Sequence, residues 1–156
     1  MNPVVLSGQT SFFITFAASI LIWFMFAGFV FSWFGGGNIK KNQAFRVLFS
    51  TLIAWGLTQL IKTAVPTLRP FQVEGSLPMT LTIPFDSSFP SGHTASAFAL
   101  AVSVWMYKKK IGILFMVAAF IVAWGRIASN VHFFGDVLAG AGIGVTVSYI
   151  IQKLHT

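Results

Sequence analysis

The stretch FFITFAASILIWFMFAGFVFSWF, residues 12–34, decides the fold class. It is 23 residues long, and no charged side chain occurs between Met1 and Ile39. About 20 consecutive apolar residues are enough to cross the hydrocarbon core of a bilayer. A cleaved signal peptide is the weaker alternative, because no Lys or Arg precedes the run and the run is too long for a typical signal peptide. The stretch therefore predicts a transmembrane helix.

The composition of the rest of the chain agrees with a membrane protein. Of the 156 residues 56% are hydrophobic and 8% are charged, whereas a soluble domain carries roughly 25% charged residues. So few charges cannot coat a water-facing surface, which argues against a soluble enzyme, a disordered chain and a nucleic-acid-binding domain. The absence of Cys excludes disulfides and thiolate metal sites. The length predicts one domain, residues 1–156.

Four further apolar blocks of 14 to 16 residues follow: 47–61, 94–107, 111–125 and 137–152. Each is slightly short for a complete span if it is cut at the charged residues, but flanking side chains that reach toward the interface can lengthen it. The alternative for any one block is a buried or re-entrant helix. We predict an all-α membrane bundle with five transmembrane helices.

The charges of the loops predict the orientation of this bundle. With five crossings, one side holds seven basic and no acidic residues, and the other side holds three of each. The positive-inside rule makes the first side cytoplasmic, so we expect the N-terminus outside and the C-terminus inside, in a bacterial cytoplasmic membrane. The basic side comprises Lys40, Lys41, Arg46, Lys108, Lys109, Lys110 and Lys153. The three consecutive lysines predict a cytoplasmic turn rather than a nucleic-acid site.

The segment 62–93 is the one long extramembrane stretch that the pattern predicts. It contains five prolines, which disfavour continued helix: Pro66, Pro70, Pro78, Pro84 and Pro90. We expect an irregular extracytoplasmic loop that carries part of a functional site.

Ionisable side chains gather at the predicted outer ends of the helices, where they are costly and therefore usually mark a site. They are Lys62, Arg69, His93, Arg126, His132 and Asp136. Two guanidinium groups and one ammonium group suit a phosphate. The sequence Ser91-Gly92-His93 opens a predicted helix, whose free N–H groups and positive dipole end also favour an anion. We expect a phosphate-binding pocket.

The spacing of His132 and Asp136 places the two side chains on one helical face. Asp136 can then orient His132 as a nucleophile, while His93 can donate a proton to the leaving group. A zinc site of these three residues is disfavoured by the nearby cations. Ser91 as the nucleophile of a serine hydrolase is disfavoured because no G-x-S-x-G motif surrounds it.

Three motifs resemble the signatures of the type 2 phosphatidic acid phosphatase (PAP2) superfamily, in its order. They are Lys62-x6-Arg69-Pro70, Pro90-Ser91-Gly92-His93 and Arg126-x5-His132-x3-Asp136. The resemblance implies a helical core like that of PAP2 enzymes and haloperoxidases, and a phosphatase that needs no metal or cofactor and forms a phosphohistidine. It implies that His132 is the nucleophile, that Asp136 is its partner and that His93 is the general acid. The implied phosphate-binding residues are Lys62, Arg69, Ser91, Gly92 and Arg126.

Two departures and one finer likeness accompany this resemblance. Gly125 replaces the Ser of the third signature, and five predicted helices replace the usual six. Arg69-Pro70-Phe71 and Ser88-Phe89-Pro90-Ser91 are most similar to bacterial undecaprenyl-diphosphate phosphatases. A phosphatidylglycerophosphate, phosphatidate or lipid A phosphatase, a lipid phosphotransferase and a non-enzymatic membrane transporter remain alternatives.

Overall fold

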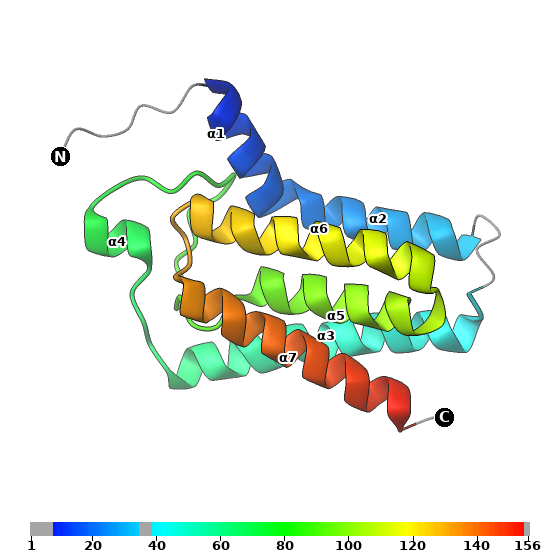
Figure 1. Ribbon diagram of the computed structural model, residues 1–156. Helices are drawn as coiled ribbons and strands as arrows, with labels where there is room; N and C mark the ends of the chain where they lie inside the picture. The colour runs from blue at the N-terminus through cyan, green and yellow to red at the C-terminus, as the bar shows by residue number, and fades with distance from the viewer. Residues whose placement is uncertain (1–7, 35–38, 155–156) are drawn as a thin grey trace.

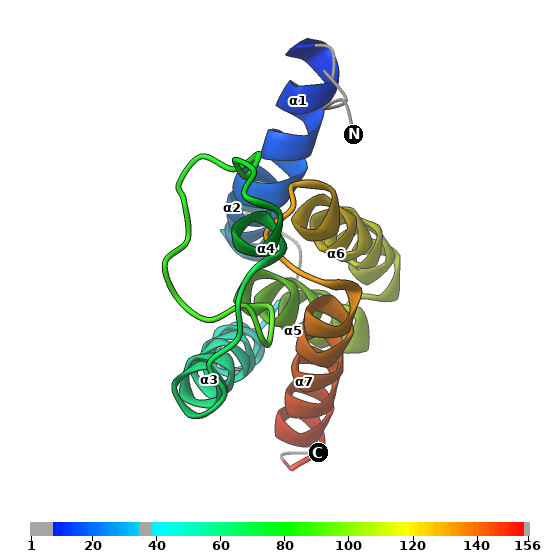
Figure 2. The same ribbon diagram turned by 90° about the vertical axis from the view of Figure 1, so that its left-hand side faces the viewer.

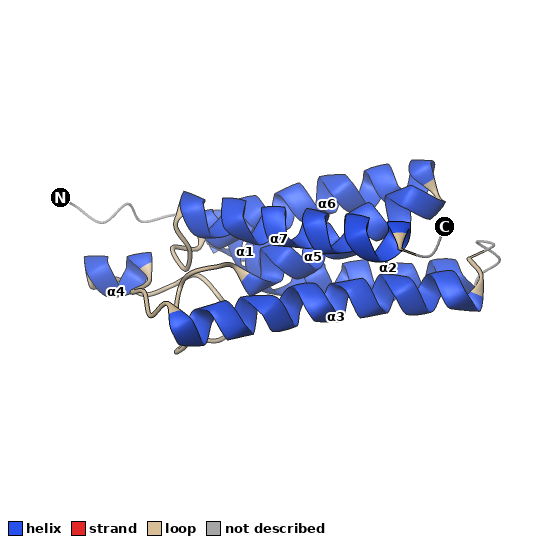
Figure 3. Cartoon of the chain, turned by 90° about the horizontal axis from the view of Figure 1, so that it is seen from below, coloured by secondary structure: helices blue, strands red, loops and turns tan. Residues whose placement is uncertain are grey.

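The computed structural model describes residues 8–34 and 39–154, and its regular elements there are all helices (Figure 3). The first rod consists of α1 (Gly8–Thr15), a π-helical turn η1 (Phe16–Ile20) and α2 (Leu21–Phe34). The helices that follow are α3 (Lys41–Ala64), α4 (Pro70–Glu74), α5 (Gly92–Tyr107), α6 (Lys109–Ala128) and α7 (Phe134–Lys153). The rod bends at η1, so that α1 leans away from the bundle (Figure 1), as π turns commonly cause.

Four helices are long and apolar enough to cross a membrane: Ser11–Phe34, Lys41–Ala64, Lys109–Ala128 and Phe134–Lys153. The first matches the stretch 12–34 closely, and the other three exceed the apolar blocks of the sequence because the helix continues through charged residues at their ends. The fifth predicted span corresponds to α5, which has 16 residues. At 1.5 Å per residue it is shorter than a hydrocarbon core of about 30 Å. The prediction of crossing helices is thus supported for four of the five.

The helix α5 lies at the centre of the bundle, enclosed by α2, α3, α6 and α7 (Figure 2). Its alanines are fully buried: Ala95, Ala97, Ala99 and Ala101. Small residues let helix backbones approach closely. Gly140 and Gly144 of α7 make this possible, because a Cβ atom there would lie 2.5 Å from the Ser91 carbonyl oxygen and 2.3 Å from the Ala95 carbonyl oxygen. Close packing therefore fixes the start of α5 against α7.

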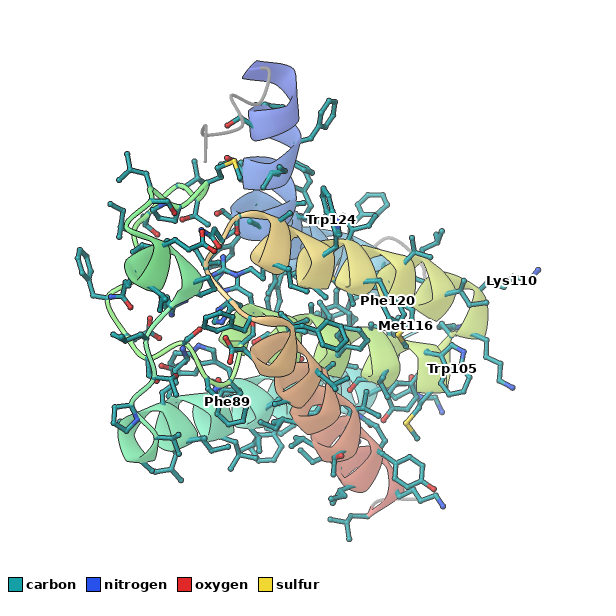
Figure 4. The ribbon with its side chains drawn as sticks, turned by 60° about the vertical axis from the view of Figure 1, so that its left-hand side comes forward. Phe89, Trp105, Lys110, Met116, Phe120 and Trp124 are labelled. Atoms are coloured by element: carbon teal, nitrogen blue, oxygen red, sulfur yellow. The ribbon has the colours of Figure 1, made fainter. Side chains whose placement is uncertain are left out.

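The two ends of the bundle differ in chemistry. At one end lie the C-terminal ends of α3 and α6, the N-terminal ends of α5 and α7, and α4 (Figure 1). The segment between α3 and α5 forms only the short α4 as regular structure, which agrees with the predicted irregular loop. Lys110 projects from the opposite end (Figure 4). All three signature motifs thus lie at the loop end, away from the lysine cluster.

Candidate functional site

A cavity of about 500 Å³, the cationic cavity, opens at the loop end of the bundle. Its walls include six of the eight predicted site residues: Lys62, Arg69, Gly92, His93, Arg126 and His132. The other two support this wall. Ser91 is buried with its Oγ 2.9 Å from Thr94 Oγ1, and Asp136 contacts the ring of His132. Four helix ends therefore bring residues 70 positions apart in the sequence to one pocket.

His132 presents one ring nitrogen to a carboxylate and the other to a cation. Its Nδ1 lies 3.4 Å from Asp136 Oδ2, and its Nε2 lies 3.3 Å from Arg69 Nη1. His132, Asp136 and Arg69 are all buried. The backbone N–H of Phe133 donates to Asp136 Oδ2 at 2.9 Å, so the carboxylate also caps the first turn of α7. This geometry directs Nε2 of His132 into the cationic cavity.

Ser88 is a part of this arrangement to which the sequence analysis gave no role. Its hydroxyl donates to Asp136 Oδ2 at 2.5 Å and lies 3.5 Å from His132 Nδ1. The side chain is fully buried. The serine stands two residues before Pro90 in the stretch that resembles undecaprenyl-diphosphate phosphatases, which was the one available signal. Ser88 therefore holds the carboxylate that orients His132.

The surroundings of His132 keep its ring neutral. Burial is the largest effect and lowers its pKa; the hydrogen bond with Asp136 raises it, and the charges of Arg126, Arg69 and Lys62 lower it further, to about 4. A neutral imidazole has one unprotonated nitrogen. With Asp136 beside Nδ1, that lone pair is on Nε2, on the side of the ring that faces Arg69.

Arg69 and Lys62 are fixed by the loop that precedes α5. Arg69 donates through Nε to the Asp86 carbonyl at 3.0 Å and through Nη1 to the Val131 carbonyl at 2.8 Å. Both cations form ion pairs with the Asp86 carboxylate, at 2.9 Å for Lys62 and 2.7 Å for Arg69. Asp86 is the second residue that the sequence analysis left without a role, because it lies in an unpatterned loop.

Arg126 is held by the first rod. Its Nη1 donates to the carbonyl of Ala18 at 2.8 Å, which lies in the π-helical turn. Leu21 N–H there bonds to the Phe16 carbonyl, five residues back, and π turns are frequent at functional sites. The buried Nε of Arg126 has no hydrogen-bond partner among the described residues. Arg126, which lines the cationic cavity, thus retains one N–H donor without a partner among the described residues.

Close packing against η1 explains why Gly125 replaces the serine of the third signature. A Cβ atom on Gly125 would lie 2.8 Å from the Ala17 carbonyl carbon, the Ala17 Cβ and the Ala18 backbone nitrogen. Such distances require the backbone to move. A serine at this position would therefore separate α6 from η1 and pull Arg126 away from the Ala18 carbonyl.

A second cavity of about 310 Å³, the apolar groove, adjoins the cationic cavity between α2 and α3. Trp23, Trp55, Gly92 and His93 line both cavities. The groove continues along apolar side chains that include Ile22, Phe26, Leu48 and Leu52. Trp23 and Leu52 are largely exposed on the surface of the bundle. The polar pocket is therefore continuous with an apolar path to the outside of the helices.

Within the part of the chain that the structure describes, no three His, Cys, Asp or Glu side chains gather closely enough to hold a metal ion. The charged side chains in the lining of the cationic cavity are instead three cations, Lys62, Arg69 and Arg126, and one carboxylate, Asp86. In this helical bundle a carboxylate orients a histidine among three buried cations. Such an arrangement is typical of a helical membrane phosphatase.

The chain belongs to the PAP2 superfamily, whose family model matches residues 43–156. The resemblance drawn from the three signatures is confirmed. The crystal structure of LpxE from Aquifex aeolicus superimposes with a TM-score of 0.78 at 27% identity, over 96% of this chain and 88% of that one. The fold is therefore that of PAP2 proteins.

Two relatives extend the comparison. The bacitracin transport permease protein BcrC of Bacillus licheniformis is 29% identical over 145 residues, which cover 93% of this chain and 67% of that protein. The undecaprenyl-diphosphatase of Sulfolobus acidocaldarius is 30% identical over 117 residues, 74% of this chain and 57% of its own length. The chain thus spans between about half and two thirds of these relatives.

Proposed function

We propose that the chain hydrolyses undecaprenyl diphosphate to undecaprenyl phosphate and phosphate, without a metal, through a phosphohistidine intermediate. The observation that carries the proposal is the junction of the cationic cavity with the apolar groove. A phosphate bound to the cations leaves its hydrocarbon tail at the two tryptophans that both cavities share. The relative named undecaprenyl-diphosphatase supports this substrate.

The first chemical step is attack on the terminal phosphorus by Nε2 of His132. Burial and the charges of Arg126, His132 and Arg69 lower the pKa of His93 to about 3, so this ring is neutral in the empty site and takes up a proton when the bound diphosphate offsets the charge of the cations. The bond from phosphorus to the bridging oxygen breaks, and the protonated His93 at the start of α5 gives that oxygen its proton. Asp136 stabilises the positive charge that develops on the imidazole. Lys62, Arg69, Arg126 and the free N–H groups at the start of α5 stabilise the charge on the equatorial oxygens. Ser91 and Gly92 form the turn that presents those N–H groups.

The second step releases phosphate. His93, now neutral, takes a proton from water, whose oxygen attacks the phosphorus of the phosphohistidine. The bond to Nε2 breaks, and His132 returns to its neutral form while Asp136 keeps the ring in place. The three cations hold the phosphoryl oxygens in both steps, so preorganised electrostatics supply much of the rate.

We place this site on the extracytoplasmic face of a bacterial membrane. The signature motifs lie at the loop end of the bundle, and Lys110 projects from the opposite end (Figure 4). The positive-inside rule puts the lysine end in the cytoplasm. The expected C-terminal side follows, because α7 ends with Lys153 at the basic end. The predicted position of the N-terminus concerns residues 1–7, which lie outside the described residues.

A substrate panel tests this proposal. The purified chain in detergent is expected to release phosphate from undecaprenyl diphosphate with a kcat/KM at least about tenfold above those for phosphatidylglycerophosphate, phosphatidate and lipid A, since one apolar groove accommodates a single chain best. Phosphate release is expected to survive EDTA. A higher kcat/KM on another lipid would overturn the substrate, and activity lost in EDTA and restored by a divalent ion would overturn the metal-independent mechanism.

The name of the permease relative favours a second candidate, a transporter whose outer charges relay an anion. Proteoliposomes separate the two functions. A phosphatase releases phosphate from lipid in plain water without an acceptor lipid, which also distinguishes it from a phosphotransferase. Anion flux without phosphate release would instead establish the transporter.

Replacing Gly125 with alanine is expected to weaken catalysis through Arg126. The added Cβ forces α6 and η1 apart, and overpacking of this kind costs about 1–3 kcal/mol. We expect kcat/KM to fall by about tenfold or more. Gly142→Ala is the matched control, because the new Cβ meets no described atom within 4 Å.

A double-mutant cycle with Arg126→Ala shows whether the effect passes through Arg126. Gly125→Ala is expected to add little to the loss in the Arg126→Ala background. Full additivity of the two losses would contradict this role of Gly125, as would wild-type kcat/KM in the single variant.

A further inference from the structure

Asp86 is the acidic side chain in the lining of the cationic cavity, and neither the signature motifs nor the two-step mechanism uses it. Its Oδ1 lies 2.7 Å from Arg69 Nη2 and its Oδ2 lies 2.9 Å from Lys62 Nζ. One carboxylate therefore bridges two of the three cations that the mechanism assigns to phosphate. A phosphoryl group binds such a pair of cations in the same way, through two of its oxygens.

The carboxylate is the most exposed member of this group. The side chains of Lys62 and Arg69 are 6% and 2% exposed, whereas that of Asp86 is 48% exposed. Asp86 also lies in the stretch between α4 and α5, which contains no helix or strand. A rotation of its side chain toward solvent is therefore possible without displacing a helix.

The two cations keep partners when the carboxylate leaves. Arg69 Nε donates to the Asp86 carbonyl at 3.0 Å, and Nη2 donates to the Ser87 carbonyl at 3.2 Å. Lys62 Nζ also donates to the Ser87 carbonyl. These backbone bonds hold the cations in place, so the carboxylate itself is not required to position them.

Electrostatics make the carboxylate and a phosphate compete. Burial raises the pKa of Asp86, but the hydrogen bonds and charges of Lys62 and Arg69 outweigh this effect and hold the pKa below its usual value. Asp86 is therefore ionised at neutral pH. A carboxylate and a phosphate dianion on the same two cations would repel each other strongly, because like charges a few ångströms apart in a partly buried pocket are poorly screened.

We propose that Asp86 is a resident counter-ion that exchanges with phosphate on Lys62 and Arg69. Its carboxylate leaves as the substrate phosphate enters, and it returns as the product phosphate departs. The buried cations are thereby neutralised in the empty site, and the product does not remain trapped on three positive charges. The inference rests on the proposed function, because it requires that the cationic cavity bind phosphate.

The test compares Asp86→Asn with Glu74→Gln in the full chain in detergent. Both variants remove one negative charge and keep the size of the side chain. Glu74 is exposed and bonds to Asn130 Nδ2 at 2.7 Å, and it does not line the cationic cavity. Inhibition of undecaprenyl diphosphate hydrolysis by inorganic phosphate and by orthovanadate is measured, together with kcat and KM.

Asp86→Asn is expected to lower the inhibition constants of phosphate and vanadate by about tenfold or more, as removal of a competing charge requires. It should lower KM as well, and Glu74→Gln should leave all these constants within about twofold. A structural role for Asp86 predicts the opposite sign, since disordered cations bind phosphate more weakly. Asp86→Ala is a second variant, and it too is expected to lower the inhibition constants of phosphate and vanadate.

Unchanged or raised inhibition constants in both Asp86 variants would overturn the inference while leaving the proposed function intact. A wild-type protein that releases phosphate from no lipid would overturn the proposed function, and the inference with it. The two failures are therefore distinguishable in one set of assays.

Discussion

His132→Ala is expected to abolish phosphate release while substrate binding persists. The variant loses the nitrogen that forms the bond to phosphorus, whereas the three cations and the apolar groove remain. Removal of a nucleophile from a covalent mechanism costs at least roughly a thousandfold in kcat. Binding is measured with labelled undecaprenyl diphosphate under conditions where the wild type is quenched rapidly. Turnover and binding should therefore separate in this variant.

The covalent intermediate provides a second readout for His132. Brief incubation of the wild type with ³²P-labelled substrate should label the protein through an acid-labile bond, and His132→Ala should carry no label. His155→Ala is the control, because this histidine lies outside the three signatures. Turnover at the wild-type rate in His132→Ala would refute the assignment of the nucleophile. Equal ³²P labelling of His132→Ala and the wild type would refute it as well.

Asp136→Asn is expected to have the second-largest effect, a fall in kcat of roughly 10²–10⁴-fold, as for other orienting carboxylates. The carboxylate accepts bonds from Ser88 and the Phe133 N–H while it contacts His132 Nδ1. An amide in its place lacks the charge that stabilises the imidazolium, and its NH₂ group can favour the wrong tautomer of His132. KM should change little, because Asp136 does not line the cationic cavity.

Rapid-quench measurement of phosphohistidine formation locates the effect of Asp136→Asn. The first step should slow in proportion to kcat. Glu74→Gln again serves as the control for loss of one negative charge. A wild-type rate of phosphohistidine formation in Asp136→Asn would remove the orienting role, and a large rise in KM with normal kcat would make Asp136 a binding residue instead.

The spacing of the signature residues predicted much of this site, because residues four apart on a helix lie on the same face. His132 and Asp136 are four residues apart, and the structure brings their side chains to 3.4 Å. Lys62, His93 and Arg126 lie near helix ends that the apolar blocks had located, so the cavity at one end of the bundle follows from the topology. The fifth crossing stays a prediction, because α5 runs from the loop end to the lysine end but has only 16 residues, fewer than the roughly 20 of a complete span.

The residues that the sequence analysis missed act through contacts between distant segments. Asp86 and Ser88 lie in a loop whose path no periodicity describes, and they become informative only where that loop meets Arg69 and Asp136. The carbonyl of Ala18 reaches Arg126 across 108 positions of sequence. Every residue type has a backbone carbonyl, so the sequence does not indicate the contact of Ala18 with Arg126. Gly125 is the one sequence feature related to it, because a side chain there would prevent the close approach of α6 to η1.

The sequence by itself determined that this protein is a helical membrane bundle with cationic and histidine side chains gathered at one end. Apolar stretches of this length must satisfy their backbone hydrogen bonds internally in lipid, and helices do so residue by residue. Only the tertiary structure decided which groups complete the pocket: the loop carboxylate on Lys62 and Arg69, the serine on Asp136 and the π turn on Arg126. These contacts depend on how closely separate segments pack, which no local pattern specifies.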